Sequence, residues 1–237
     1  MIEFVDNFIL CDCLTILYLF FMNRMGEIGV CNVLKWVEFV DKMKPAQRCK
    51  LAEAGVECML DIQPIRLRKS ILTFMIKAFD PDTEKIIIQA NHPGITLKEV
   101  DVDAIFDLKD KADGLVVADI VYEEGRYTMH EIPPQFLSKS TGNLKIDDLI
   151  ADAIKSQVAH DDFLRRVVLV LLGTVLAPQS LITVPREYYF VVKDVKRMKK
   201  MDFNGYTRTF LIENFKKLGT GYETMQWPYG NLALAQV

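Results

Sequence analysis

Residues 161–178 constrain the fold of this chain more than any other stretch. They read DDFLRRVVLVLLGTVLAP and are apolar on nearly every side of a helix, so protein should surround them. Asp161 and Asp162 suit a helix N-terminus, because carboxylates there accept backbone N–H groups and oppose the helix dipole. Pro178 ends the run, since proline cannot continue the hydrogen-bond ladder. The apolar part is shorter than the roughly 20 residues of a membrane span, so we expect the central helix of a mostly helical domain.

The composition is that of a globular chain with little overall charge. Half of its 237 residues are hydrophobic, 26% are charged, and the formal net charge is -3. Such a chain can bury a full core, and its charge gives no general attraction to nucleic acid or to an anionic membrane. The odd number of cysteines predicts reduced, mostly buried thiols in a cytosolic or nuclear protein rather than a disulfide framework. They are Cys11, Cys13, Cys31, Cys49 and Cys58.

The N-terminal segment is strongly apolar and has two open interpretations. Residues 8–22 read FILCDCLTILYLFFM, but Glu3 and Asp6 stand where a signal peptide would be basic, and no cleavage site follows. Asp12 interrupts the run, which is short for a membrane anchor. The segment is either a buried first helix or an apolar extension over 1–29 that a mistaken start site created. We favour the extension because turn and capping signals are missing.

Periodic apolar residues predict helices over 30–43, 46–54, 66–79 and 146–158, with Gly55 as the left-handed residue that ends the second. The first helix should bury Val33, Leu34, Val37, Val40 and Met43. The third should bury Leu67, Ile71, Phe74, Met75 and Ala78. The fourth should bury Leu149, Ala153 and Ile154.

A small hairpin should follow the third helix. Residues 80–83 form a turn, residues 85–89 the clearest strand, and Ile95 a short return strand. Thr96 then caps another helix, with Glu99 completing a capping box.

The second half of the chain combines an irregular region with further helices. Residues 110–145 contain several glycines and prolines and are expected to form a long insertion, with one strand over 115–122. Pro185 begins a helix over 185–201, and Asn204 caps the last clear helix. The buried side of the 185–201 helix should contain Tyr188, Val191, Val192, Val195 and Met198.

These elements define the expected fold class and domain organisation. We expect a mainly α protein: a multi-helix globular domain over residues 30–237, with a small β-hairpin and one long irregular insertion at 110–145. Near the end, Trp227 has little sequence left to cover it, and an apolar helical pattern over 232–235 stops at Val237. We therefore expect a domain that is truncated at its C-terminus.

The order of these elements resembles that of a known family. The segments that carry the resemblance are KPAQRCKLAEAGVECMLDI, RLRKSILTFMIKAFDPDTEKIIIQ, ITLKEVDVDAIFDL, DDFLRRVVLVLLGTVLAP, VPREYYFVVKDVKRMKKMDFNGYTRTFLIENF and WPYGNLALAQ. Over residues 43–237 the chain resembles the plant mobile domain family, which carries the label "aminotransferase-like". The resemblance rests on core pattern and element order, and it implies a plant, transposon-derived, mainly helical domain without a defined biochemistry. Some members of the family are fused to a ubiquitin-like protease domain.

No motif for cofactor chemistry accompanies the resemblance. A pyridoxal phosphate enzyme needs a lysine Schiff base, an acid for the pyridine nitrogen and a phosphate cup. The G-x-G of Gly219 and Gly221 follows a helix instead of joining a strand to one, and no Walker lysine motif occurs. We therefore expect no cofactor and no genuine aminotransferase activity.

Metal and cysteine-protease chemistry are not expected either. Cys11 and Cys13 lack a second ligand pair at zinc-site spacing. Nothing in the sequence brings Cys58 and a histidine together as nucleophile and base. His160, beside Asp161, is most simply part of a helix cap. The three histidines are scattered: His92, His130 and His160.

One charged cluster is a candidate contact surface. It contains the five cations at the end of the 185–201 helix, namely Lys193, Lys196, Arg197, Lys199 and Lys200. Their spacing places several of them opposite the stripe of Tyr188 and Val195. The cluster is either a solvated face that suits the negative end of a helix or a surface that contacts phosphate or nucleic acid. No stacking-aromatic or helix-turn-helix motif supports the second. Arg165 and Arg166 should pair with acids near the central helix.

Two hypotheses for the function follow from the resemblance. The first is a non-catalytic protein-interaction module of a transposon-derived plant protein, nuclear rather than cytoplasmic, which binds a partner protein or chromatin and no membrane. The second is the N-terminal regulatory or recruiting region of a ubiquitin-like cysteine protease whose catalytic domain is absent. The sequence downstream of Val237 separates them, because a protease domain in frame would favour the second.

Overall fold

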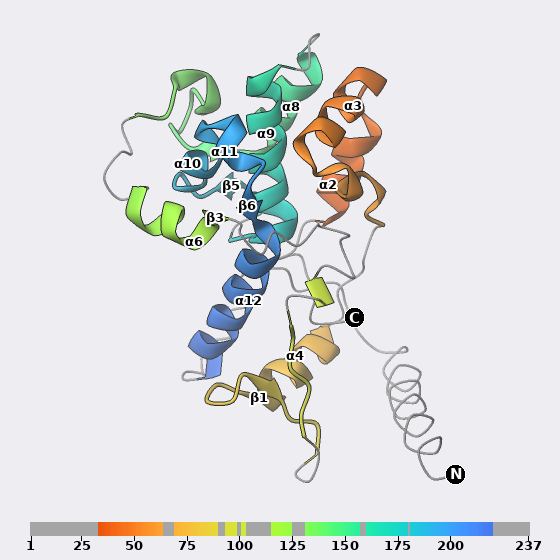
Figure 1. The fold of residues 1–237 in the computed structure, drawn as a ribbon, viewed down its shortest axis with the longest axis vertical. Helices are drawn as coiled ribbons and strands as arrows, with labels where there is room; N and C mark the ends of the chain where they lie inside the picture. Colours follow the sequence, from red (N-terminus) through yellow and green to blue (C-terminus); the bar gives the residue numbers. More distant parts are fainter. Residues whose placement is uncertain are drawn as a thin grey trace.

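The computed structural model places most of the described chain in helices (Figure 1). It describes residues 33–63, 69–89, 93–98, 101–102, 115–124, 131–156, 160–179 and 181–219. The mainly α class predicted from the sequence is confirmed, since the strands within these ranges are two residues long and form two-stranded pairings. Among the described residues, no helix is long and apolar enough to cross a membrane.

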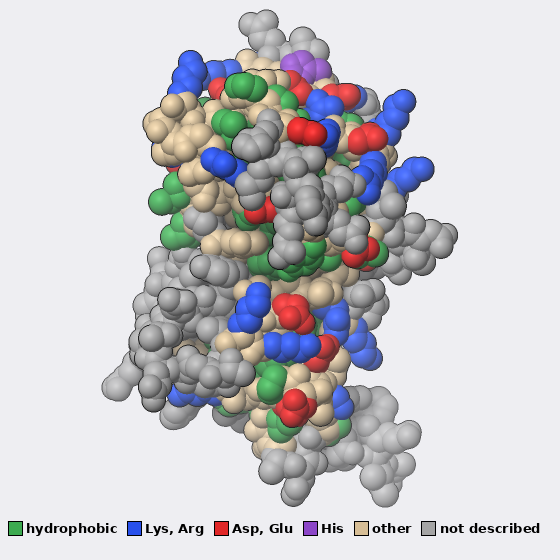
Figure 2. Space-filling view, turned by 90° about the vertical axis from the view of Figure 1, so that its left-hand side faces the viewer, with side chains coloured by type: hydrophobic (Ala, Val, Ile, Leu, Met, Phe, Trp, Pro, Cys, Tyr) green, Lys and Arg blue, Asp and Glu red, His purple; other side chains and the backbone are tan. Residues whose placement is uncertain are grey.

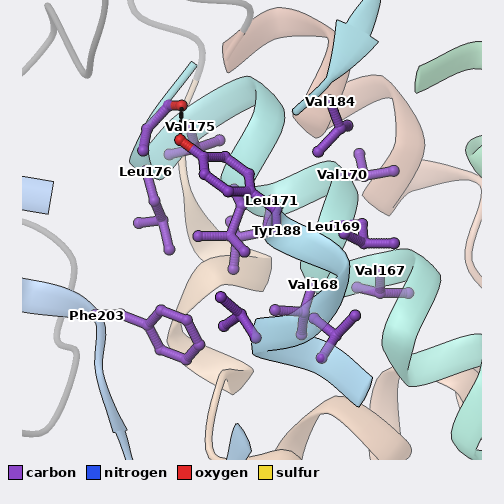
Figure 3. Close-up of a cluster of buried hydrophobic side chains, with 14 of the residues drawn as sticks. Val167, Val168, Leu169, Val170, Leu171, Val175, Leu176, Val184, Tyr188 and Phe203 are labelled. Carbon is purple, nitrogen blue, oxygen red and sulfur yellow. Dashed lines mark hydrogen bonds between the residues drawn. The ribbon is translucent and has the colours of Figure 1, made fainter. Parts of the chain in front are cut away.

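The apolar helix predicted at the centre of the fold is present. It is observed as α9 (Asp161–Leu171), followed directly by η5 (Leu172–Leu176), in which the hydrogen bonds widen to the π-helical pattern. Residues 167–172 and 175–177 have no exposed side-chain surface. Figure 3 shows these valines and leucines packed around Tyr188. The prediction of a helix enclosed by protein is therefore confirmed.

The start of α9 is fixed by polar side chains. His160 lies at the N-cap, where its Nδ1 accepts a hydrogen bond of 3.3 Å from the backbone N–H of Phe163. Asp161 and Asp162 occupy the first turn, and Asp162 also forms an ion pair of 2.5 Å with Arg165. These positions confirm the acidic first turn and the histidine cap expected from the sequence.

One side of the core is formed by α2 (Val33–Asp41), α3 (Pro45–Ala54) and the 3-10 segment η1 (Glu57–Asp61). Trp36 is fully buried between these elements, and its Nε1 donates a hydrogen bond of 2.7 Å to the carbonyl oxygen of Met59. This bond fastens η1 to α2 and satisfies the one polar group of a buried indole.

Two predictions about this side of the core have opposite outcomes. Gly55 ends α3 with a φ of 73°, the left-handed conformation expected there. Leu34, in contrast, was expected to be buried and is 56% exposed. The helix turns Trp36 and Phe39 inward instead, because two aromatic rings remove more apolar area from water than one leucine does.

The next layer is formed by α8 (Ile146–Lys155), which packs against α9. It begins directly after β4 (Leu144–Lys145), which pairs antiparallel with β5 (Thr183–Val184). The inward positions predicted for α8 face the core: Leu149, Ala153 and Ile154.

The region expected to be an insertion, 110–145, contributes to the same core. Among its described residues, Ile132, Phe136 and Leu144 are buried. Phe136 ends the 3-10 segment η4 (Pro134–Phe136), and its ring lies 5.3 Å from that of Tyr189. These side chains pack into the domain although the backbone around them is irregular.

The strand predicted over 115–122 is wrong. Only β3 (Leu115–Val116) is extended, and it pairs in parallel with β6 (Met201–Asp202). The chain then continues as α6 (Val117–Asp119) and the π-helical segment η2 (Ile120–Glu124).

The burial of the side chains explains this difference. Val117 and Ile120, three residues apart, are buried, whereas Val116 and Tyr122 are 55% and 68% exposed. A spacing of three describes a helical face, while a strand would bury every second residue. The β-branched and aromatic content of the segment favours a strand locally, but packing overrides that preference.

The lower part of the molecule in Figure 1 contains α4 (Lys69–Ala78) and the predicted hairpin. β1 (Phe79–Asp80) pairs antiparallel with β2 (Lys85–Ile86). Ile95 returns to Ile86 through two backbone hydrogen bonds of 2.8 and 2.9 Å. The hairpin and the return of Ile95 are therefore confirmed, but the strand predicted over 85–89 is wrong in its extent, since it ends at Ile86.

The buried stripe predicted for α4 needs correction. Phe74 is 41% exposed, while Ile76 is buried. α4 runs directly into β1, where the ring of Phe79 lies 5.5 Å from that of Phe215. The side of α4 that faces the core is therefore the one that carries Ile76 and continues into Phe79. Leu67 lies outside the described residues.

The helix start predicted at Thr96 is displaced. The backbone at Thr96 is not helical, and Glu99 lies outside the described residues. The carboxylate of Asp101 accepts a hydrogen bond of 2.6 Å from the N–H of Lys98. This bond from a backbone N–H to a carboxylate three residues later is one half of a capping box, and it is made at Lys98 instead of Thr96.

The long helix α12 (Phe203–Gly219) extends from the upper part of the molecule to the lower part (Figure 1). Its N-cap is Asp202, whose Oδ1 accepts a hydrogen bond of 3.0 Å from the N–H of Gly205. The prediction of Asn204 as the cap is therefore wrong. Asp202 takes this role because it is still extended in β6, as a capping residue must be, while Asn204 is already helical and buried.

A cluster of ion pairs fastens the hairpin to α12. Glu84 has a φ of 54° in the hairpin turn, and its Oε1 lies 2.8 Å from Lys216 Nζ. Its Oε2 lies 3.3 Å from Arg208 Nη2, and Arg208 Nε donates to the Leu97 carbonyl at 2.7 Å. The hydrogen bond from Lys216 is the main cause that lowers the pKa of Glu84.

We expect Glu84→Gln to destabilise the protein at neutral pH by about 0.3–1 kcal/mol, as for other partly exposed ion pairs. Because the pKa of Glu84 is lower in the folded than in the unfolded chain, its contribution is present above the ordinary value of 4.5 and disappears as the pH falls through the folded-state pKa. Urea unfolding at pH 7 and at pH ~3 should show a clearly smaller difference at the lower pH. Glu38→Gln, which removes an exposed acid of α2, is the control. An equal effect of Glu84→Gln at both pH values would contradict this role.

Candidate functional site

The basic cluster predicted from the sequence lies on two short helices and the turn that follows them, instead of on one helix. The chain forms α10 (Tyr188–Lys193) and α11 (Val195–Met198), separated by Asp194 with φ -105° and ψ 106°. The carboxylate of Asp194 accepts hydrogen bonds of 2.8 and 3.2 Å from the N–H groups of Lys196 and Arg197. The continuous helix predicted over 185–201 is therefore wrong, because Asp194 caps a new helix there.

The buried side predicted for this segment is nevertheless confirmed. All five of its residues are buried: Tyr188, Val191, Val192, Val195 and Met198. α10 and α11 share one inward face because the chain breaks between them at Asp194, whose side chain is exposed.

We use the name basic surface for Lys193, Lys196, Arg197, Lys199 and Lys200. The side chains of Lys196, Lys199 and Lys200 are exposed, and that of Arg197 is half-buried. Lys196 lies in α11, and Lys199 and Lys200 lie in the turn that directly follows it. Val195 and Met198 anchor the opposite side of the same turn in the core.

Lys193 is tied to the rest of the chain. Its Nζ forms an ion pair with Glu131 and lies 5.8 Å from the centroid of the Phe190 ring. Its carbonyl oxygen accepts a hydrogen bond of 3.3 Å from Arg165 Nε, and Arg165 also pairs with Asp162. The end of α10 is thereby connected to the first turn of α9.

The two arginines expected to pair with acids behave differently. Arg165 does pair with Asp162, which confirms the prediction for that residue. Arg166 is buried and donates instead to the carbonyl oxygens of Asp162, at 3.3 Å, and Gln135, at 3.2 Å. Its guanidinium carbon lies 4.7 Å from the centroid of the Phe136 ring. Arg166 therefore fastens η4 to α9 through carbonyl groups, and the prediction of an acidic partner is wrong for it.

Charges of both signs share the outer surface of the domain. Figure 2 shows Lys and Arg side chains beside Asp and Glu side chains on the upper part of one face, and the same mixture recurs below. Around the basic surface, Glu131, Asp194 and Asp202 supply negative charge. The cations of the basic surface therefore lie among acids of the same chain.

Two buried tyrosines, Tyr188 in α10 and Tyr206 in α12, lie next to each other. Tyr188 donates a hydrogen bond of 2.9 Å to the Ala177 carbonyl oxygen, drawn as a dashed line in Figure 3, and accepts one of 3.3 Å from Gln179 Nε2. Burial raises the pKa of Tyr188 to about 12, and burial likewise raises that of Tyr206, whose ring lies 6.1 Å away. Both hydroxyl groups therefore stay protonated at neutral pH and join η5, α10 and α12.

The remaining candidate groups are separate from one another. Cys49 is exposed and Cys58 is half-buried, so the expectation of mostly buried thiols fails for Cys49, which lies on the outer side of α3. Neither of these two cysteines forms a disulfide bond. Within the described ranges, no three His, Cys, Asp or Glu side chains are grouped as metal ligands would be. Several predicted candidates lie outside those ranges: Cys11, Cys13, Cys31, His92, His130 and Gly221.

Sequence reasoning did not find the side chains that hold this site in place. The signal for Asp194 was present, because an acid between an apolar run and a basic run is a common N-cap. The role of Arg166 depends on a contact with residue 135, which lies 31 positions away. No local pattern reports such a contact.

Fold and surface together define a mainly helical domain that carries a short basic turn on a buried core. This chain belongs to the family described as "Domain of unknown function (DUF8566)", which matches residues 30–233. No curated protein and no solved structure matches the chain.

Proposed function

We propose that this domain is a non-catalytic protein-interaction module that contacts its partner through the basic surface. The observation that carries the proposal is the exposure of Lys196 in α11 and of Lys199 and Lys200 in the turn that directly follows it. Cations on an exposed turn suit an anionic surface of a partner protein, because complementary charge guides association. Val195 and Met198 are buried on the other side of this turn and hold it in place.

The polar groups best suited to chemistry have structural partners, which supports a non-catalytic role. His160 caps α9, Tyr188 bonds to the Ala177 carbonyl oxygen, and Arg166 bonds to two carbonyl oxygens. Each of these side chains satisfies a backbone group that folding would otherwise leave unpaired.

The resemblance to the plant mobile domain family extends the proposal. It favours a transposon-derived plant protein that acts in the nucleus, through a partner protein rather than through a cofactor. The alternative is the N-terminal regulatory or recruiting region of a ubiquitin-like cysteine protease. Both assignments are predictions.

Site-directed photo-cross-linking in cells of the source organism tests the proposed module. A photoreactive amino acid replaces Lys196 in one version of the full chain and Lys77, an exposed residue of α4, in another. We expect a discrete protein adduct, identified by mass spectrometry, from position 196 and not from position 77. Equal adducts from both positions, or nucleic acid as the sole adduct, would contradict the proposal.

A further inference from the structure

We propose that the β1–β2 hairpin and residues 93–97 form a flap that opens from α12 as one unit while the core around α9 stays folded, and that Glu84 is the latch that holds this flap closed. Figure 1 shows β1 and the end of α12 in the lower part of the molecule, away from α9. The inference goes beyond the proposed function and does not depend on it, because the basic surface lies on other elements.

One side chain connects the flap to α12. Glu84 lies in the turn between β1 and β2, and its two carboxylate oxygens pair with Lys216 Nζ at 2.8 Å and with Arg208 Nη2 at 3.3 Å. Arg208 Nε also donates a hydrogen bond of 2.7 Å to the carbonyl oxygen of Leu97. The turn of the hairpin and the end of the return segment are therefore fastened to the same helix through one network.

The backbone at Glu84 indicates that its carboxylate serves this purpose. The φ of 54° is left-handed, which is costly for a residue with a Cβ atom and is more often found at glycine. Glycine would relieve this strain but would remove the carboxylate that Arg208 and Lys216 share. Strained residues of this kind cluster at clamps and switch regions.

The apolar contact beneath the flap is small. The ring of Phe79 lies 5.5 Å from that of Phe215, and Phe79 and Ile86 remain 7% and 9% exposed. Ile95 in the return segment is 46% exposed, whereas residues 167–172 of the core have no exposed surface. A segment with so little buried apolar surface opens at a lower free energy than an enclosed core does. Its opening uncovers the ring of Phe215.

Three backbone hydrogen bonds report on the closed flap. The N–H of Ile86 donates to the carbonyl oxygen of Ile95 at 2.8 Å, and the N–H of Ile95 donates to that of Ile86 at 2.9 Å. The N–H of Ile87 donates to the carbonyl oxygen of Ala78 at 2.7 Å. These three amides exchange their hydrogens with water when the flap opens, so their exchange rates measure its opening.

Hydrogen exchange of single backbone amides, followed by NMR at neutral pH, tests the inference on the full chain. The three flap amides are compared with the amides of residues 169–171 in α9. Glu84→Gln removes the latch, and Asp82→Asn removes an exposed acid from the same turn as the matched control. Leu171→Ala and the milder Gly173→Ala weaken the core instead, so the second variant decides if the first does not fold.

We expect Glu84→Gln to speed exchange at the flap amides by about two- to fivefold, and Asp82→Asn by less than about 1.5-fold. Raising sodium chloride from about 0.05 M to about 0.5 M should speed flap exchange more in the parent chain than in Glu84→Gln, because salt screens the ion pairs that the variant lacks. Equal effects of Glu84→Gln and Asp82→Asn would overturn the role of Glu84 as the latch.

The core variants test whether the flap opens by itself. Leu171→Ala should speed exchange at residues 169–171 by about thirtyfold or more, and Gly173→Ala by about fivefold or more. Both should change exchange at the flap amides by less than about twofold, since local opening leaves the contacts of α9 intact. Equal acceleration of flap and core amides would show that the flap opens only when the whole domain unfolds, and would overturn the inference.

Discussion

Leu171→Ala should lower the free energy of unfolding by about 2–5 kcal/mol. Leu171 has no exposed surface and lies at the point where α9 passes into η5, with core side chains on every side (Figure 3). The substitution removes buried apolar area and leaves a cavity that the surrounding helices cannot fill. Leu172→Ala should have an effect of the same size, because Leu172 is equally buried. Urea unfolding followed by circular dichroism measures both changes.

Leu34→Ala is the matched control for this prediction. It makes the same chemical change at a leucine of α2 that is 56% exposed, so it should change the free energy of unfolding by less than about 0.5 kcal/mol. The control also tests the corrected orientation of α2, which turns Trp36 and Phe39 inward. Equal effects of Leu34→Ala and Leu171→Ala would mean that α9 is not the centre of the core.

Gly173→Ala should destabilise the domain by about 1–3 kcal/mol, although alanine is the better helix former. A Cβ atom at Gly173 would lie 2.7 Å from Cγ2 of Val184, which is shorter than real Cβ contacts. Val184 is buried in β5 and has a stiff, β-branched side chain, so it has little room to move away. The glycine is required because η5 and β5 approach so closely.

A double-mutant cycle separates this steric effect from other causes. In a chain that carries Val184→Ala, the contact at 2.7 Å no longer exists, so adding Gly173→Ala should cost nothing or stabilise the helix. The two substitutions should therefore show a coupling of about 1–3 kcal/mol in thermal or urea unfolding. Additive effects would show that Val184 is not what excludes a side chain at position 173.

The parts of the fold that could be predicted from the sequence are those in which the apolar pattern is strong. α9 was predictable because nearly every residue after its first turn is apolar, and the hairpin because Pro81 and Asp82 mark its turn. Where the apolar pattern fitted both a helix and a strand, or two orientations of one helix, tertiary packing determined the structure. Val117, Ile120, Val121 and Tyr122 favour a strand locally, but the segment buries a helical face of Val117 and Ile120. Likewise Leu34 and Trp36 compete for the inward side of α2, and the larger ring is buried.

The candidate site was only partly predictable. The cations of the basic surface are visible in the sequence, and so is the buried stripe opposite them. The break at Asp194, the ion pair between Lys193 and Glu131 and the bond from Arg165 to the end of α10 depend on tertiary contacts. The periodic pattern predicts only that several of the cations lie opposite the buried stripe, and it does not show these contacts.

The central claim is that the basic surface binds a partner protein, while the buried core only holds this surface in place. The most direct measurement is the recovery of the protein that cross-links at position 196, by affinity purification of tagged full-length chains from cells. The parent chain is compared with a reversal variant that carries Lys196→Glu and Lys200→Glu, and with a control variant that carries Lys42→Glu and Lys98→Glu at exposed lysines elsewhere. The unfolding temperature of each is measured. We predict that the reversal variant loses the partner at an unchanged unfolding temperature and that the control variant keeps it. Retention of the partner by the reversal variant, or a loss accompanied by a fall in unfolding temperature like that of Leu171→Ala, would contradict the claim.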